Sequence, residues 1–165
     1  MSGRVTNPSD AFPPSVGISL DYPDGWEPLA GAGVHLAVVR IMPPGEFRPN
    51  VVATVKRMDA AFTLDSAVQQ LHAKLATLPE YEQHTEERRQ VLGAAGFAAE
   101  GEYTHPQAGS LAIVTAMTVV SRPNAVDLVE ISGTCAAGQV EDVIEDIRGM
   151  LTGARIEKTA LVVAR

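Results

Sequence analysis

Two apolar runs joined by turn residues dominate the hydrophobic pattern of the chain between residues 111 and 135. In the first run apolar residues occupy both alternating sets of positions. Because successive strand side chains point to opposite faces, both faces of this strand should be covered. The second run, residues 126–132, is mixed, since Asp127 and Glu130 interrupt it. The pattern predicts a long hairpin at the centre of one sheet, with its second strand nearer an edge or an end.

Two segments carry the 3.6-residue period of an amphipathic helix. In residues 64–78 apolar side chains recur on one stripe, Thr63 is placed to cap the first turn, and Pro79 ends the pattern. Residues 137–151 have a second apolar stripe, with acidic side chains turned away from its centre. We predict one helix from each segment.

Shorter alternating runs predict the remaining strands. These are residues 17–22, 34–42, 50–58, 82–92 and 97–104, with a short tail strand from Ile156 through Val163. From residue 82 onward the connections are too short to hold crossover helices, so we expect an antiparallel meander. Residues 1–15 contain three prolines and little periodicity, which indicates a flexible arm ahead of a single domain of residues 16–165.

The charge balance argues against polyanionic partners. The chain has 13 lysines and arginines against 20 acidic residues, for a formal net charge of -7. Phosphate backbones and anionic membranes are bound by clustered basic residues, so we expect no nucleic acid partner. No apolar run approaches the roughly 20 residues that span a bilayer, and residues 1–15 show neither a signal-peptide core nor a lipidation cysteine. We therefore expect no membrane insertion and a cytoplasmic location.

Residues that could carry catalysis or hold a metal are scattered along the chain. The four histidines have no partner at metal-ligand spacing, and the one cysteine, Cys135, ends an apolar run. Strand alternation places Glu100 and Glu102 on one face, but a solvated sheet face is the commoner use of such a pair. The sequence therefore predicts no catalytic residues, no metal site and no cofactor. An enzyme, to be tested at His105 or Glu102, is the third of three hypotheses.

The first hypothesis is a non-catalytic interaction or accessory protein that recognises another protein. Aromatic and arginine side chains, which are enriched in binding hot spots, gather in and beside turns of the first third of the chain. The candidate partner-binding residues are Trp26, Arg40, Phe47, Arg48 and Asn50. Two simpler interpretations stay open: Trp26 can plug the end of the core, and the proline-rich loop 43–49 can be a solvated connection.

The second hypothesis is a carrier of a small apolar ligand. Ala67 on the first predicted helix, with Ala112 and Ala116 on the sheet, would leave room for a lipid-like molecule between the two. Close backbone packing is the alternative use of these alanines. A meander with a free edge strand could also pair with itself, so a homodimer through a sheet edge is a candidate assembly.

The start of the predicted domain resembles a known superfamily. Residues 17–26, GISLDYPDGW, combine an extended strand, a proline, a turn and a tryptophan, and this order resembles the opening of Mog/PsbP-like domains. Similar features follow in similar order: RPN at residues 48–50 entering a strand, the helix of residues 64–78, a meander, and ISGT at residues 131–134 ahead of a last helix. Within this superfamily the chain is most similar to the actinobacterial LpqN/LpqT-like group, over about residues 16–156.

The resemblance implies an α+β fold, a Mog/PsbP-like α/β/α sandwich in which helices cover both faces of a largely antiparallel sheet of six or seven strands. It also implies a non-enzymatic role: small GTPase binding in the Mog branch, photosystem assembly in PsbP, and envelope-associated binding in the LpqN group. Trp26 matches the superfamily signature, which implies a packing role for it. No residues of a GTPase or photosystem interface are matched.

Overall fold

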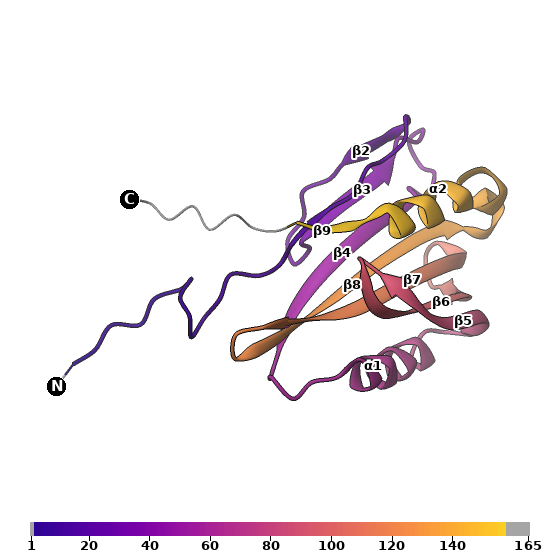
Figure 1. The fold of residues 1–165 in the computed structure, drawn as a ribbon. Coiled ribbons are helices and arrows are strands. Elements are labelled where there is room, and N and C mark those ends of the chain that lie inside the picture. The colour runs from indigo at the N-terminus through magenta and orange to yellow at the C-terminus, as the bar shows by residue number, and fades with distance from the viewer. Residues whose placement is uncertain (1, 158–165) are drawn as a thin grey trace.

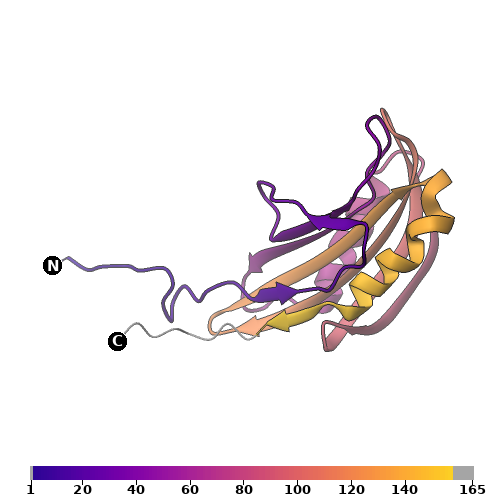
Figure 2. The same ribbon diagram turned by 90° about the horizontal axis from the view of Figure 1, so that it is seen from above.

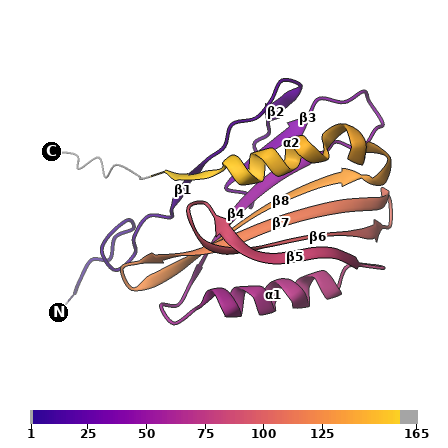
Figure 3. The same cartoon turned by 45° about the vertical axis from the view of Figure 1, so that its right-hand side comes forward.

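The computed structural model describes residues 2–157, which form a large sheet, a small sheet and two α-helices (Figure 1). The large sheet consists of β2 (Trp26–Pro28), β3 (Leu36–Arg40), β4 (Asn50–Met58), β5 (Glu82–Val91), β6 (Ala94–His105), β7 (Gly109–Arg122) and β8 (Ala125–Ala136). Its order is β2-β3-β4-β8-β7-β6-β5, and every neighbouring pair is antiparallel. The helices α1 (Leu64–Ala76) and α2 (Val140–Gly153) cover opposite faces (Figures 2 and 3), which confirms the predicted α+β sandwich.

The hairpin of β7 and β8 lies at the centre of the sheet, as predicted. Its tight turn contains Asn124, which has a positive φ of 62°. However, β8 lies between β4 and β7 as the fourth of seven strands, so the prediction that it lies nearer an edge is wrong. Its two acidic residues misled that prediction: Asp127 is buried beside two arginines, and Glu130 pairs with Lys74. A central strand can carry carboxylates when each has a basic partner.

The sequence predicts the start of α1 correctly. Thr63 Oγ1 accepts a hydrogen bond from the Ser66 amide at 3.2 Å, which caps the first turn. The helix ends at Ala76, two residues before the predicted end at residue 78. Its buried side chains pack on the face of the sheet that carries Phe97, Met117 and Leu128, and these helix residues are Ala67, Val68, Leu71 and Leu75.

The other face of the sheet is covered by α2, which follows almost directly from β8. A short 3-10 helix, η1 (Ala137–Gln139), forms the first turn of the predicted helix. Gly133 of β8 lies beneath Ile147, and a Cβ at position 133 would clash with Ile147 Cγ2. Glycine therefore allows α2 to approach the central strand closely. Of the two helices in residues 2–157, neither is long and apolar enough to cross a membrane.

The first strands are shorter than predicted. The run 17–22 forms only β1 (Gly17–Ser19), which pairs with β9 (Arg155–Glu157) in the small sheet, because β9 offers three partner residues. The run 34–42 is extended only over β3, and the edge strand β2, starting at Trp26, was not predicted. The bounds of β4 are as predicted. Residues 158–163 of the predicted tail strand lie outside the described residues.

The edge strand β5 is exposed at eight of its ten residues. The turn into β6 was predicted at residues 93–96, which is wrong. The turn consists of Leu92 and Gly93, whose φ angles are 55° and 78°, and β6 begins directly after them. Two successive positive φ angles suit the twist of a tight hairpin. The hairpin holds β5 against β6, and no described strand pairs with the other edge of β5.

Candidate functional site

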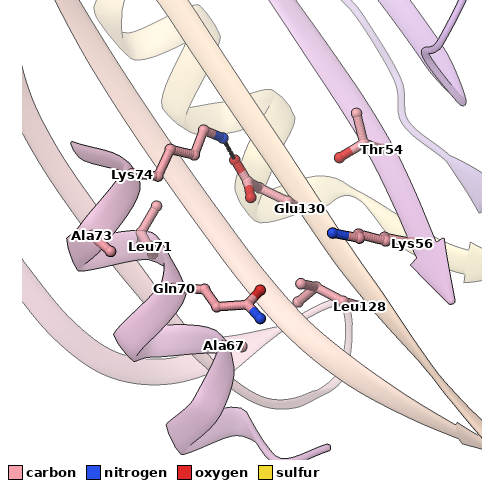
Figure 4. A pocket seen from close by; sticks show the side chains of 9 residues that line it. All are labelled: Thr54, Lys56, Ala67, Gln70, Leu71, Ala73, Lys74, Leu128 and Glu130. Atoms are coloured by element: carbon pink, nitrogen blue, oxygen red, sulfur yellow. Dashed lines mark hydrogen bonds and ion pairs between the residues drawn. The ribbon is translucent and has the colours of Figure 1, made fainter. Parts of the chain in front are cut away.

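A groove lies between α1 and the sheet on the side of β4 and β8 (Figure 4). The helix contacts β6 and β7, so beside it the same sheet face is hollowed. The groove has a volume of about 410 Å³ and is lined by Thr54, Lys56, Ala67, Gln70, Leu71, Ala73, Lys74, Leu128 and Glu130. This volume falls within the range of small-molecule sites.

The floor of the groove is apolar. Ala67 and Leu71 come from the buried side of α1, and Leu128 comes from β8. All three belong to the core beneath the helix, and Ala67 is fully buried. An apolar chain placed on this floor would itself leave water and would cover the small part of Leu71 and Leu128 that stays exposed, which is favourable.

Charged and polar side chains form the rim. Lys74 Nζ donates a hydrogen bond to Glu130 Oε1 at 2.6 Å. Thr54 is opposite Glu130 and Lys56 is opposite Leu128 in the register of β4 and β8, so these side chains share one sheet face (Figure 4). Lys56 has no ion-pair partner among the described residues. Because Lys74 neutralises Glu130, the groove keeps the net positive charge of Lys56.

The groove lies beside the helix for which we predicted a pocket, but the residues that line the groove differ from those predicted. Ala67 lines it, whereas Ala112 and Ala116 belong to the core under α2 on the opposite sheet face. Their prediction as pocket residues is therefore wrong, because even-numbered residues of this part of β7 face α2. Lys56 and Glu130 were missed, because only the long-range pairing of β4 with β8 brings them together. Alternating polar positions on these strands were the only local signal.

Trp26, predicted as a partner-binding residue, belongs to the core under α2 and is only 4% exposed. Its indole Nε1 donates a hydrogen bond to Asp146 Oδ2 at 3.1 Å. Arg40, opposite Trp26 in the register of β2 and β3, donates to the same oxygen at 3.4 Å. The interpretation of Trp26 as a core plug is correct, and its side chain is not available for partner contact. These residues tie the edge of the sheet to α2.

The other three candidates form a separate group at the start of β4. Arg48 Nη2 lies 3.2 Å from Glu27 Oε1, and Asn50 Nδ2 donates to the Arg48 carbonyl at 3.2 Å. Phe47 is half-buried, and its carbonyl accepts a hydrogen bond from Gln139 Nε2 at 2.8 Å. The loop 43–49 is thus held at its end, and Arg48 stays exposed.

A buried carboxylate fastens the end of the N-terminal arm to the sheet. Asp127 has an exposed fraction of 0%, and Arg57 Nε donates to its Oδ1 at 3.0 Å. Asp127 Oδ2 accepts the Val16 amide at 3.2 Å. The Pro14 carbonyl accepts from Arg57 at 3.3 Å and from Arg122 at 2.6 Å. The two arginines therefore connect the hairpin and β4 to the arm.

Two of the groups considered for catalysis, Glu100 and Cys135, are paired or buried. Arg148 donates hydrogen bonds to both carboxylate oxygens of Glu100, at 2.8 and 2.7 Å. These bonds hold the pKa of Glu100 below its ordinary value. Cys135 is fully buried, and burial raises the pKa of its thiol. A buried thiol that is held protonated is a poor nucleophile.

One set of three side chains in residues 2–157 has the spacing of metal ligands. Glu82, His84 and Glu102 each offer one ligand atom, and these atoms lie within 4.8 Å of one another on β5 and β6. Carboxylate and imidazole groups can accept a divalent cation. Glu82 and His84 are exposed. The absence of a metal site therefore stays a prediction.

Solved structures with the same fold come from bacteria and yeast. The structure of LpqN from Mycobacterium tuberculosis, described as involved in cell envelope biogenesis, has a TM-score of 0.76 at 16% identity over 88% of this chain and 86% of that chain. Cyanobacterial PsbP (CyanoP) from Synechocystis has a TM-score of 0.55 at 14% identity, over 94% and 98% of the two chains. The Ran-binding protein Mog1p of Saccharomyces cerevisiae has a TM-score of 0.51 at 11% identity, over 85% and 90%. These likenesses show a common fold.

The family comparison is more specific. No curated protein matches the chain. The family model described as probable lipoprotein LpqN matches residues 5–157, which is most of the 165 residues. The match confirms the resemblance to the LpqN-like group of the Mog/PsbP-like superfamily. The chain belongs to the family described as probable lipoprotein LpqN.

Proposed function

We propose that this protein is a non-catalytic accessory protein of the cell envelope that binds an amphipathic small molecule in the groove between α1 and β8. The observation that carries the proposal is the groove of about 410 Å³ with its apolar floor and charged rim. That combination suits a ligand with an apolar chain and a polar head. Cell envelopes are rich in molecules of this kind.

The charges on the rim favour an anionic head group. Glu130 is already paired with Lys74, whereas Lys56 has no ion-pair partner within residues 2–157. A negative head beside Lys56 would gain an ion pair, and the Gln70 amide on the opposite wall can donate a further hydrogen bond. The chain of the ligand would then lie along the floor. We expect an anionic amphiphile to bind more tightly than a cationic one of equal chain length.

Family membership supports an envelope location rather than the cytoplasmic one expected from the sequence. The family is described as a probable lipoprotein, and its M. tuberculosis member as involved in cell envelope biogenesis. Fractionation of cells that express the full-length natural protein tests this part of the proposal. Recovery with envelope membranes is expected, and recovery with the cytosol would contradict it.

The groove is tested by filling it with a side chain. Ala73 is exposed and lines the groove, and Ala76 is exposed on the same helix but does not line it. Ala73→Trp should place an indole in the groove, whereas Ala76→Trp is the matched control. Displacement of a fluorescent fatty acid by dodecanoate and by dodecyltrimethylammonium measures the affinities.

We expect the wild type and Ala76→Trp to bind dodecanoate more tightly than the ammonium compound. Ala73→Trp should weaken dodecanoate binding at least about tenfold, or about 1.4 kcal/mol. Lys56→Glu should remove the preference for the carboxylate. Equal affinities of the two tryptophan variants would exclude the groove as the binding site.

Recognition of a protein through the loop 43–49 is a second proposal. Arg48 is exposed, and Ile41, just before the loop, is 58% exposed. An arginine beside an exposed apolar residue is typical of contact surfaces. Ile41→Asp combined with Arg48→Glu should abolish capture of a cross-linked protein partner without lowering the Tm. Leu29→Asp, at another exposed apolar position that is 45% exposed, is the control, and unchanged capture by the double variant would exclude the loop.

A further inference from the structure

The free edge of β5 is a surface that the groove does not use. β5 is the last strand of the large sheet, and eight of its ten residues are exposed. Backbone groups of a strand point alternately to its two sides, so every second residue of β5 directs its N–H and C=O away from β6. Such an edge can accept another strand unless its side chains prevent pairing.

The charges along β5 are ordered rather than uniform. Glu86 and Glu87 are followed directly by Arg88 and Arg89. A row of one sign would repel a second copy, but acidic residues followed by basic ones complement the same sequence running in the opposite direction. We infer that a second copy of this chain pairs with β5 along this edge, antiparallel, to form a homodimer with one continuous sheet.

Symmetry restricts the register of this pairing. Two copies of one strand become antiparallel neighbours when a two-fold axis runs perpendicular to the sheet, and one residue then lies opposite its own copy. With Arg88 on the axis, Glu87 lies opposite Arg89 of the second copy, and Arg89 lies opposite Glu87 of the second copy. Glu86 then lies opposite Gln90. Two symmetric ion pairs result on the α2 side of the sheet.

Contacts within the chain favour this register over its neighbours. Arg88 Nη2 is already held by Asp65 Oδ1 of α1 at 2.6 Å, so two copies of Arg88 can meet at the axis with their charges compensated. Within one chain Arg89 Nη1 lies 3.9 Å from Glu87 Oε1, which is a long ion pair that a closer one with the second copy can replace. With Glu87 on the axis instead, two carboxylates would lie opposite each other, and like charges in that position destabilise a pair.

The dimer leaves the groove accessible. β5 is separated from β8 by β6 and β7, and the groove opens beside β8 and β4. A two-fold axis perpendicular to the sheet keeps both copies of α1 on the same face. Both grooves of the dimer therefore open on one side of the assembly, and loss of either property does not imply loss of the other.

Sedimentation equilibrium of the full chain tests the dimer by charge exchange. The wild type should sediment at twice the chain mass of 17.5 kDa. Glu87→Arg and Arg89→Glu each place like charges opposite each other twice, so each variant should self-associate at least about tenfold more weakly. An equimolar mixture of the two variants should dimerise again, because both pairs between positions 87 and 89 are then of opposite sign. Glu141→Arg, at an exposed position of α2, is the control for net charge.

The double variant Glu87→Arg with Arg89→Glu keeps the composition of the wild type and restores complementarity in the reverse order, so it should dimerise. A wild type that is monomeric at its highest soluble concentration would overturn the proposal. Dimers that persist equally in both single variants would also overturn it, because their interface would lie elsewhere.

Discussion

Among single residues, Asp127 has the most demanding environment. Its carboxylate is fully buried, and it accepts hydrogen bonds from Arg57 and from the Val16 amide. A buried carboxylate costs free energy unless it is paired, and its removal leaves its basic partners uncompensated. The free-energy cost of burying Asp127 is therefore offset only by its ion pairs and hydrogen bonds.

Asp127→Asn should lower the free energy of unfolding by about 3 kcal/mol, because the arginines beside it lose their counter-charge. Urea denaturation at neutral pH measures the change. Asp59→Asn, at an exposed position, is the matched control and should change stability by less than about 0.5 kcal/mol. Equal effects of the two substitutions would show that the buried ion pairs do not stabilise the fold.

Glu100 gives the protein a pH-dependent contribution. Its pKa in the folded state lies below the ordinary value of 4.5, first because of the hydrogen bonds from Arg148. A lowered folded pKa stabilises the fold above the ordinary pKa, and this contribution is lost as the pH falls through the folded pKa. Arg148→Met should remove up to about 1 kcal/mol at neutral pH, since the pair is partly exposed. The difference from wild type should shrink below about pH 4.5, and a difference that grows in acid would contradict the assignment.

At the scale of elements, the sequence pattern correctly predicted the features that depend on residues close together in the chain. The bounds of β4 and the capped start of α1 follow from alternation and from Thr63, so both were predicted correctly. β2 is only three residues long, and Trp26 is held by Asp146, which is 120 positions away. Nothing near Trp26 in the sequence indicates that contact. The partners of Asp127 and Glu130 are also distant in the sequence and were not predicted. For this reason β8 was predicted too near an edge.

α2 approaches β8 closely at Gly133. Gly133→Ala should cost about 2 kcal/mol of unfolding free energy, because the new methyl group clashes with Ile147 Cγ2. Ile147→Ala should make the same substitution much less costly. A double-mutant cycle by thermal or urea denaturation measures this coupling, which should exceed about 1 kcal/mol. Additive effects would mean that this contact does not determine how closely α2 packs on β8.

At the scale of the whole molecule, the two helices divide the sheet unequally. α2 packs along the central strand, and the core on its face contains residues from all seven strands of the large sheet. α1 packs over β6 and β7, and the groove forms beside it, where the helix no longer covers the sheet. The sequence predicted the helix and one wall of this groove, at Ala67. The other wall depends on the pairing of β4 with β8, which the sequence pattern does not contain.

Amide chemical-shift mapping of the labelled protein with dodecanoate tests the central claim most directly. We predict that the largest shifts lie at Thr54, Lys56, Gln70, Ala73 and Leu128, because these residues line the groove. A second hollow of about 460 Å³, beside Pro14, Val120 and Arg122, provides an internal comparison. Shifts centred on that second hollow, or no saturable shifts, would contradict ligand binding between α1 and β8.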